Sequence, residues 1–262
     1  MGPPWTIRRG EGPIVAAAIH DGHEMRPAVA ARVALTDQER GREEDPFTAR
    51  WTEIAPHRVL VHRSRFEVDM NRPRDQAVYL LPEQAWGLTL WNAPLPARLR
   101  EQSLDDYDAF YAAVFDLLSE VRARHGCFVV LDLHSYNHRR EGPAAPPAPP
   151  EENPEINVGT GTMDRGRWRP VVERFLDDLR RFERRGRRLD VRENVRFRGG
   201  YFPRWIHETF PESGCALAIE VKKFFMDEWT GEPDRAQLQF VREALDATMP
   251  GILEELQACG TR

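Results

Sequence analysis

The sequence predicts an α/β domain, in which buried strands alternate with amphipathic helices. Four short apolar runs, each bounded by turn residues, are typical of strands that are covered on both faces. These runs are residues 13–20, 57–62, 127–134 and 215–221, and a weaker fifth candidate lies at 156–159. Helical patterns lie between the runs, and this alternation is typical of a layered α/β fold.

The clearest helical pattern covers residues 104–125, where apolar side chains recur at spacings of three and four residues. Such spacing places them on one face of a helix. We expect Ser103 to cap the start of this helix and Gly126 to end it. Two further amphipathic helices are predicted at residues 167–182 and 234–259. Pro250 is expected to kink or split the second of them.

The chain of 262 residues shows no internal repeat and no second apolar core, so we expect one domain over residues 1–262. One segment, residues 142–154, reads GPAAPPAPPEENP and can form neither a helix nor a central strand. We predict a polyproline-like loop there. Because it begins eight residues after His134, it is either a tolerated surface insertion or a flap beside a site.

The bulk properties exclude several classes of partner. The 37 basic and 42 acidic residues are intermixed, and the net charge is −5, which argues against a nucleic acid or a membrane surface. The N-terminal segment lacks the apolar stretch of a secretory signal, and no run of 18 apolar residues occurs. We therefore expect no membrane span and a cytoplasmic location. Three cysteines without C-x-x-C spacing, Cys127, Cys215 and Cys259, predict reduced thiols rather than a disulfide framework or a metal cluster.

Two histidines stand at the ends of apolar runs. His20 ends the first run and His134 ends the third. In open α/β sheets ligands bind beyond the carboxyl ends of the strands, so two distant histidines can converge there. Neutral imidazole is a good zinc ligand. We therefore predict a metal ion, with zinc as the first candidate, held by His20 and His134. Such donors also accept other divalent metals.

A catalytic zinc ion typically takes three protein ligands and keeps one position for water. His23 lies three residues after His20, a spacing that can close on one ion, and Glu24 lies in the same loop. Asp45 lies in the charged segment 42–47 and is another candidate. We favour His23 or Asp45 as the third ligand, and their spacing does not separate them.

A carboxylate, Glu220, stands inside the apolar run 215–221. Burying it is costly unless it is paired or has chemical work to do. Lys222 would point to the same side of a strand, so a buried ion pair between Glu220 and Lys222 is one interpretation. The other is a general base that takes a proton from water, because a dry site raises the pKa of a carboxylate towards the useful range.

Three side chains are candidates for holding an anionic substrate. Arg72 offers a planar fork that matches a carboxylate, and Asn71 adds a neutral donor beside it. Arg204 follows Gly199 and Gly200, two glycines that allow close backbone approach, and is a second candidate contact for an anion.

Four segments occur in the order seen in the N-formylglutamate amidohydrolases, whose relatives are the aspartoacylases and zinc carboxypeptidases. They are His20 with its loop, Asp69-Met70-Asn71-Arg72, Leu131-Asp132-Leu133-His134-Ser135 and Ala218-Ile219-Glu220. The segment that contains Gly199, Gly200 and Arg204 resembles another block of the same family. The resemblance covers about residues 13–226, and its motifs are specific in combination.

The resemblance implies a phosphorylase/hydrolase-like fold with a central mixed sheet, helices on both faces and one zinc ion per chain. It implies His20 and His134 as ligands, Glu220 as the base, and Asn71 and Arg72 as holders of a substrate carboxylate. The implied reaction is hydrolysis of the amide bond of a small anionic N-acyl amino acid such as N-formylglutamate. The alternatives are a carboxypeptidase or amidase that acts on a larger acyl-amino acid or peptide, and a non-catalytic binding protein.

The resemblance leaves the third ligand open. Relatives of the aspartoacylase type carry a glutamate at the position of His23, whereas formylglutamate hydrolases place an aspartate in a segment similar to the one that contains Asp45. Arg204 is also a candidate for stabilising the oxyanion of the reaction.

Overall fold

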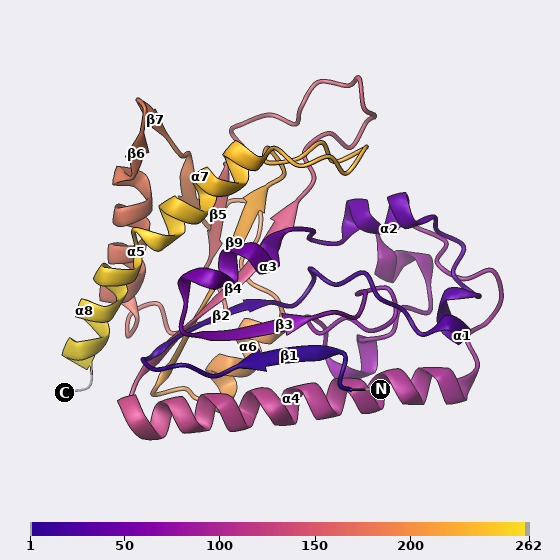
Figure 1. The fold of residues 1–262 in the computed structure, drawn as a ribbon, viewed down its shortest axis with the longest axis horizontal. Helices are drawn as coiled ribbons and strands as arrows, with labels where there is room; N and C mark the ends of the chain where they lie inside the picture. Colours follow the sequence, from indigo (N-terminus) through magenta and orange to yellow (C-terminus); the bar gives the residue numbers. More distant parts are fainter. Residues whose placement is uncertain (1, 260–262) are drawn as a thin grey trace.

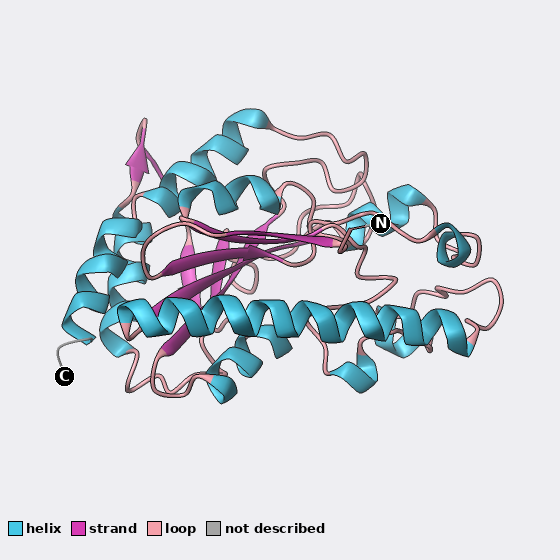
Figure 2. Cartoon of the chain, turned by 60° about the horizontal axis from the view of Figure 1, so that its bottom comes forward, coloured by secondary structure: helices cyan, strands magenta, loops and turns pink. Residues whose placement is uncertain are grey.

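The computed structural model describes residues 2–259 and has a seven-stranded mixed sheet at its centre (Figures 1 and 2). The strand order is β1-β3-β2-β4-β9-β5-β8. The strands are β1 (Trp5–Arg8), β2 (Ile14–Ala18), β3 (His57–Val61), β4 (Phe128–Tyr136), β5 (Ile156–Gly159), β8 (Val191–Glu193) and β9 (Gly214–Lys222). Strands β3, β2, β4 and β9 run parallel to one another. Strand β1 is antiparallel to β3, and β5 is antiparallel to β9 but parallel to β8.

All five predicted strands are present, and three of them form the parallel centre of the sheet, β2, β4 and β9. Their side chains are buried on both faces, which explains why their sequences are nearly continuous apolar runs. The edge strands β1 and β8 were not predicted. Both are short and only partly buried, so they lack that signal.

The helices cover both faces of the sheet, as the resemblance implies (Figures 1 and 2). They are α1 (Pro27–Ala30), α2 (Asp37–Glu43), α3 (Thr48–Trp51), α4 (Ala97–His125), α5 (Arg169–Arg181), α6 (Tyr201–Thr209), α7 (Arg235–Asp246) and α8 (Met249–Cys259). Single turns of 3-10 helix occur at Thr52–Ile54, Arg74–Gln76 and Pro82–Ala85, and a small ribbon pairs β6 (Glu183–Arg184) with β7 (Arg187–Arg188). Helices α4 and α6 share one apolar core with the sheet, and α3, α5, α7 and α8 share the other.

The long helix α4 begins earlier than its apolar pattern suggests. It starts at Ala97, so the expectation that Ser103 caps it is wrong. Ser103 is buried inside the helix, where its hydroxyl donates to the carbonyl oxygen of Leu99 at 3.2 Å. The first turns carry mostly polar residues and therefore add little to the apolar periodicity. Gly126 ends the helix with a positive φ of 77°, as predicted.

The C-terminal amphipathic segment is two helices, as expected from Pro250. Helix α7 ends at Asp246 and α8 begins at Met249, which places Pro250 in the first turn of α8. Proline is tolerated there because the first amide groups of a helix have no partners within the helix. Asp234 caps α7 by accepting the amides of Ala236 and Gln237.

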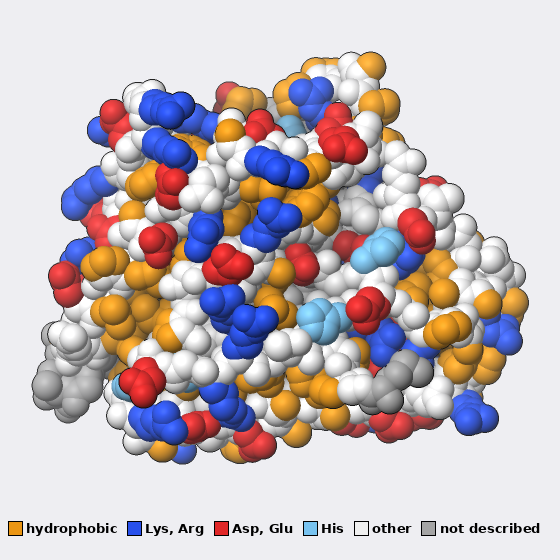
Figure 3. All heavy atoms as spheres, viewed as in Figure 1, with side chains coloured by type: hydrophobic (Ala, Val, Ile, Leu, Met, Phe, Trp, Pro, Cys, Tyr) orange, Lys and Arg blue, Asp and Glu red, His pale blue; other side chains and the backbone are white. Residues whose placement is uncertain are grey.

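Residues 142–154 form a loop without helix or strand, as predicted. The loop is tied to its base, because the amide of Ala148 donates to the carbonyl oxygen of His138 at 2.6 Å. On the face drawn in Figure 3, charged side chains of both signs are interspersed. None of the described helices combines the length and the apolar character needed to cross a membrane. Cys127 and Cys215 are buried in the core.

His207 forms a buried link between α6 and β9. Its Nε2 accepts the amide of Ala216 at 2.9 Å, and its Nδ1 lies 3.0 Å from Oγ1 of Thr162. Burial lowers the pKa of His207 from 6.5 to about 4. Between pH 6.5 and about pH 4 the unfolded chain binds a proton that the folded chain does not. The free energy of unfolding therefore decreases as the pH is lowered through this range.

We expect this residue to remove roughly 2 kcal/mol of stability between pH 7 and pH 5. Urea unfolding at the two pH values measures the loss, and His207→Gln should reduce it by about that amount, since glutamine does not titrate. An identical pH dependence in the variant would show that His207 is not the titrating group.

Candidate functional site

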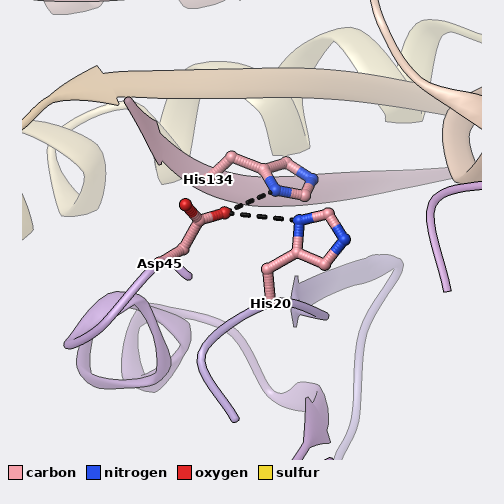
Figure 4. A group of neighbouring side chains, drawn as sticks. All are labelled: His20, Asp45 and His134. Carbon is pink, nitrogen blue, oxygen red and sulfur yellow. Dashed lines mark hydrogen bonds and ion pairs between the residues drawn. The ribbon is translucent and has the colours of Figure 1, made fainter. Parts of the chain in front are cut away.

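Three buried side chains from distant segments converge at the carboxyl edge of the parallel strands (Figure 4). His20 follows β2, Asp45 follows α2, and His134 lies on β4. Oδ2 of Asp45 lies 2.9 Å from Nδ1 of His134 and 3.4 Å from Nδ1 of His20. One ligand atom of each residue lies within 4.8 Å of the others. Ligand atoms around a tetrahedral zinc ion are roughly 3.3 Å apart, so this cluster has the donors and the spacing of a metal site.

The backbone brings Asp45 to the two histidines. Its amide donates to the carbonyl oxygen of His20 at 2.9 Å, which ties the segment after α2 to the end of β2. Its second carboxylate oxygen, Oδ1, accepts the hydroxyl of Ser135 at 3.1 Å. The carboxylate is therefore fixed from both sides.

A further carboxylate lies beside the second nitrogen of each imidazole ring. Nε2 of His20 lies 2.6 Å from Oδ1 of Asp69, and Nε2 of His134 lies 3.0 Å from Oδ2 of Asp132. Both Nδ1 atoms therefore face Asp45. This carboxylate–histidine arrangement is the usual one behind metal-bound histidines. The contact between His134 and Asp132 is an ion pair without hydrogen-bond geometry, and Nδ1 of His20 and Nε2 of His134 are both buried with no hydrogen-bond partner among the described residues. Buried polar atoms are usually satisfied, so these two favour a ligand bound at the cluster.

The electrostatics of the cluster favour a bound cation. Burial would lower the pKa of His134, but Asp132, Asp45 and Glu220 raise it well above its usual value. Burial would raise the pKa of Asp45, yet its contacts with the two histidines hold it far below the usual value. Several buried carboxylates thus surround two imidazoles, and a divalent cation would offset the excess of negative charge.

Glu220 lies on β9 directly opposite His134 of β4. Burial raises the pKa of Glu220 to about 7, and the neighbouring Asp45 and Asp132 add to the rise. The alternative ion pair with Lys222 does not form, because Nζ of Lys222 donates to the carbonyl oxygen of Asn153 at 2.8 Å. Within the described part of the chain Glu220 has no ion-pair partner, and its side chain lines the cavity described next.

A cavity of about 590 Å³ opens at this edge of the sheet. Its walls include the three clustered residues, the predicted base and every predicted substrate contact: His20, Asp45, His134, Glu220, Asn71, Arg72 and Arg204. Basic side chains outnumber acidic ones in the lining, with Arg65, Arg72, Arg140, Arg196, Arg198, Arg204 and Lys223 against Glu43, Asp45 and Glu220. Such a lining suits an anionic ligand. Residues 142–154 do not line the cavity, so the structure gives the flap interpretation no support.

Asn71 links the cavity to helix α6. Its side-chain oxygen accepts the amide of Phe202 at 2.9 Å and so supplies the cap that Gly200 lacks. A Cβ atom on Gly200 would lie 2.2 Å from that oxygen, so only glycine allows the approach. Arg72 lies beside Asn71, with its guanidinium 5.8 Å from the ring centre of Tyr79.

The other two candidate ligands lie outside the cluster. His23 is half exposed and its Nδ1 forms a hydrogen bond with the buried carboxylate of Glu44. Glu24 is exposed, and its backbone pairs with His62 and Ser64. Neither His23 nor Glu24 lines the cavity.

Three residues of this site carried no predicted role, although the first two lie in the motifs named above: Asp69, Asp132 and Lys223. Asp132 carried a usable signal, since it precedes His134 by two residues on a strand and so points to the same side. No local sequence pattern links Asp69 to His20, because the two residues come together only in the folded chain. Lys223 is buried, and its burial lowers its pKa to about 8.

The sheet and the cavity place this chain among the open-sheet α/β proteins, in which ligands bind beyond the carboxyl ends of parallel strands. The sequence model of one family, N-formylglutamate amidohydrolase, matches residues 12–226. The chain therefore belongs to the N-formylglutamate amidohydrolase family, as its motifs predict. Membership implies an enzyme that hydrolyses an amide bond.

Solved structures show the same fold. The N-formylglutamate amidohydrolase from Ralstonia eutropha JMP134 is 17% identical with a TM-score of 0.71, over 97% of this chain and 98% of the other. A gene product from Agrobacterium tumefaciens is 18% identical with a TM-score of 0.67, over 96% of each chain. The chain has no significant match among curated proteins.

Proposed function

We propose that the protein is a metal-dependent amidohydrolase that acts on an anionic N-acyl amino acid such as N-formylglutamate. The observation that carries the proposal is the buried His20–Asp45–His134 cluster, which opens into a basic cavity in a chain of this family. These three residues would hold the metal ion. Zinc suits two imidazoles and a carboxylate, and other divalent ions accept the same donors. When bound, the ion supplies the Lewis acidity that polarises the scissile carbonyl group and makes a water molecule acidic near neutral pH.

Glu220 is the general base of this proposal. Its carboxylate takes a proton from the attacking water and returns it to the nitrogen of the leaving amine. The raised pKa of Glu220, about 7, suits both transfers, because the group gains and loses a proton easily at neutral pH. Its place opposite His134 keeps it beside the metal-binding cluster.

Asn71 and Arg72 would hold a carboxylate of the substrate and so fix the acyl group over the cluster. The oxygen of Asn71 is engaged by α6, which leaves its amide NH₂ as the donor. Arg204 lies near the start of α6 at the wall of the cavity. In this proposal it would stabilise the oxyanion that forms during hydrolysis.

The size of the cavity supports a second candidate within the same chemistry. A volume of about 590 Å³ is within the range that encloses drug-sized ligands, and a formylated amino acid is smaller than these. A larger acyl-amino acid or an acylated peptide would fill more of this space. The amide chemistry and the anionic contact would be unchanged.

The test is hydrolysis of a substrate panel by zinc-loaded protein, and the release of the free amine is the measured quantity. The panel contains N-formylglutamate, N-acetylglutamate, N-formylglutamylglutamate and N-formylleucinamide, which has no carboxylate. We expect hydrolysis of the anionic members with kcat/KM at least about tenfold above that of the amide, since a hydrogen bond to a charged group contributes about 1.5–3 kcal/mol and tenfold corresponds to about 1.4 kcal/mol. Removal of the metal ion with a chelator should abolish hydrolysis of every member of the panel. Stoichiometric zinc without turnover of any member would favour a binding protein instead.

A further inference from the structure

We infer that Lys223, although it lines the cavity, is a positioning residue for the proposed metal site and fixes Asp45 in place through the backbone of the preceding turn. Lys223 directly follows β9, three residues after Glu220, and only 1% of it is exposed. Its Nζ donates to the carbonyl oxygen of Arg42 at 2.5 Å and to that of Glu44 at 2.8 Å. Both carbonyl groups belong to the end of α2 and the turn that leads to Asp45.

The peptide unit between Glu44 and Asp45 is held at both ends. Its carbonyl oxygen accepts Nζ of Lys223, and its amide, that of Asp45, donates to the carbonyl oxygen of His20. The first bond ties the turn to β9, the strand of Glu220, and the second ties it to the end of β2. Because a peptide unit is planar, holding both ends fixes the position of the Asp45 Cα atom, from which the carboxylate extends to the cluster.

The contacts of Lys223 suit positioning better than general stabilisation. A buried ammonium group is costly, and an acidic partner is the usual compensation. Among the described residues no carboxylate lies within ion-pair distance of Nζ, which donates to the two backbone carbonyl groups. Asp45, Glu43 and Glu228 act on the ammonium group only at longer range. The last carbonyl groups of a helix lack partners within it and interact favourably with a cation. Lys223 therefore donates hydrogen bonds to carbonyl groups at the end of α2, at the point where the chain turns towards the cluster.

The neighbouring Lys222 provides a matched control. Its Nζ also donates to a backbone carbonyl, that of Asn153 at 2.8 Å, but this group lies before β5 and away from the cluster. Lys222→Met and Lys223→Met thus remove the same group from adjacent positions, and only the second removes a bond to the turn of Asp45.

The experiment measures zinc affinity by competition between the full chain, stripped of metal, and a chromophoric chelator. We expect Lys223→Met to weaken zinc binding about 10–100-fold, the usual effect of losing an outer partner of a metal ligand, and Lys222→Met to change it less than about threefold. Lys223→Gln, whose amide can still donate to a carbonyl, should restore part of the affinity and serves as the readout if the methionine variant does not fold.

A double-mutant cycle separates positioning from a general loss of structure. In an Asp45→Ala background Lys223→Met should have no further effect on zinc affinity, because the group it positions has gone. An equal loss with and without the Asp45 carboxylate would overturn the inference, as would wild-type affinity in Lys223→Met. A wild-type chain that binds no zinc would overturn the metal site of the proposed function as well, so the two failures are distinguishable.

Discussion

Glu220→Gln is expected to lower kcat by about 10²–10⁴-fold while zinc affinity stays within about threefold of the wild type. Glutamine keeps the shape of the side chain on β9 but cannot accept a proton. The metal-binding cluster loses none of its three donors. The expected loss therefore falls on the chemical step rather than on metal or substrate binding, and KM should change little.

Steady-state kinetics with N-formylglutamate, together with a zinc titration of the same preparation, measures both quantities. Glu193→Gln is the matched control, since Glu193 forms its ion pair with Arg165 at 2.7 Å and does not line the cavity. Near-normal turnover in Glu220→Gln would remove Glu220 from the role of base. A loss of zinc equal to the loss of turnover would make it a metal ligand instead.

His134→Ala and Asp45→Ala are each expected to weaken zinc binding by more than about 100-fold, beyond the effect of losing an outer partner. His23→Ala should change it less than about threefold. The physical reason is that Nδ1 of His134 and the carboxylate of Asp45 lie 2.9 Å apart inside the cluster, whereas His23 is engaged by Glu44. Zinc-dependent stabilisation against heat should disappear with the affinity, because an ion that binds only the folded chain stabilises it.

Chelator competition and thermal unfolding with and without zinc give the two readouts for each variant. Here His23→Ala is both the control and the rival hypothesis, since its spacing from His20 made it a candidate ligand. A large loss of zinc in His23→Ala, with tight binding retained in Asp45→Ala, would reverse the assignment of the third ligand.

The parallel centre of the sheet could be predicted because its strands are buried on both faces. Strands β2, β4 and β9 therefore carry near-continuous apolar residues, a pattern that survives without any knowledge of their neighbours. The edge strand β1 could not, because it is half exposed and its pairing with β3 depends on the rest of the fold. The start of α4 was missed for a related reason, since its polar first turns lack a repeating apolar face.

The site was predictable where it depends on strand ends and not where it depends on the path of a loop. His20 and His134 end apolar runs, so their convergence follows from the order of parallel strands. His23 and Asp45 could not be separated, because that choice is made by the bond from the amide of Asp45 to the carbonyl oxygen of His20. That bond joins residues 25 positions apart and leaves no local pattern.

The cap that Asn71 provides for α6 also determines which hydrogen-bonding groups Asn71 presents to the cavity. A carboxamide side chain can usually rotate by half a turn and present either a donor or an acceptor. In this protein the oxygen of Asn71 accepts the amide of Phe202. Rotation of the carboxamide would break this bond and remove the cap of α6. Asn71 therefore offers the cavity N–H groups only, and at this place it discriminates against a ligand's ammonium group and in favour of a carboxylate.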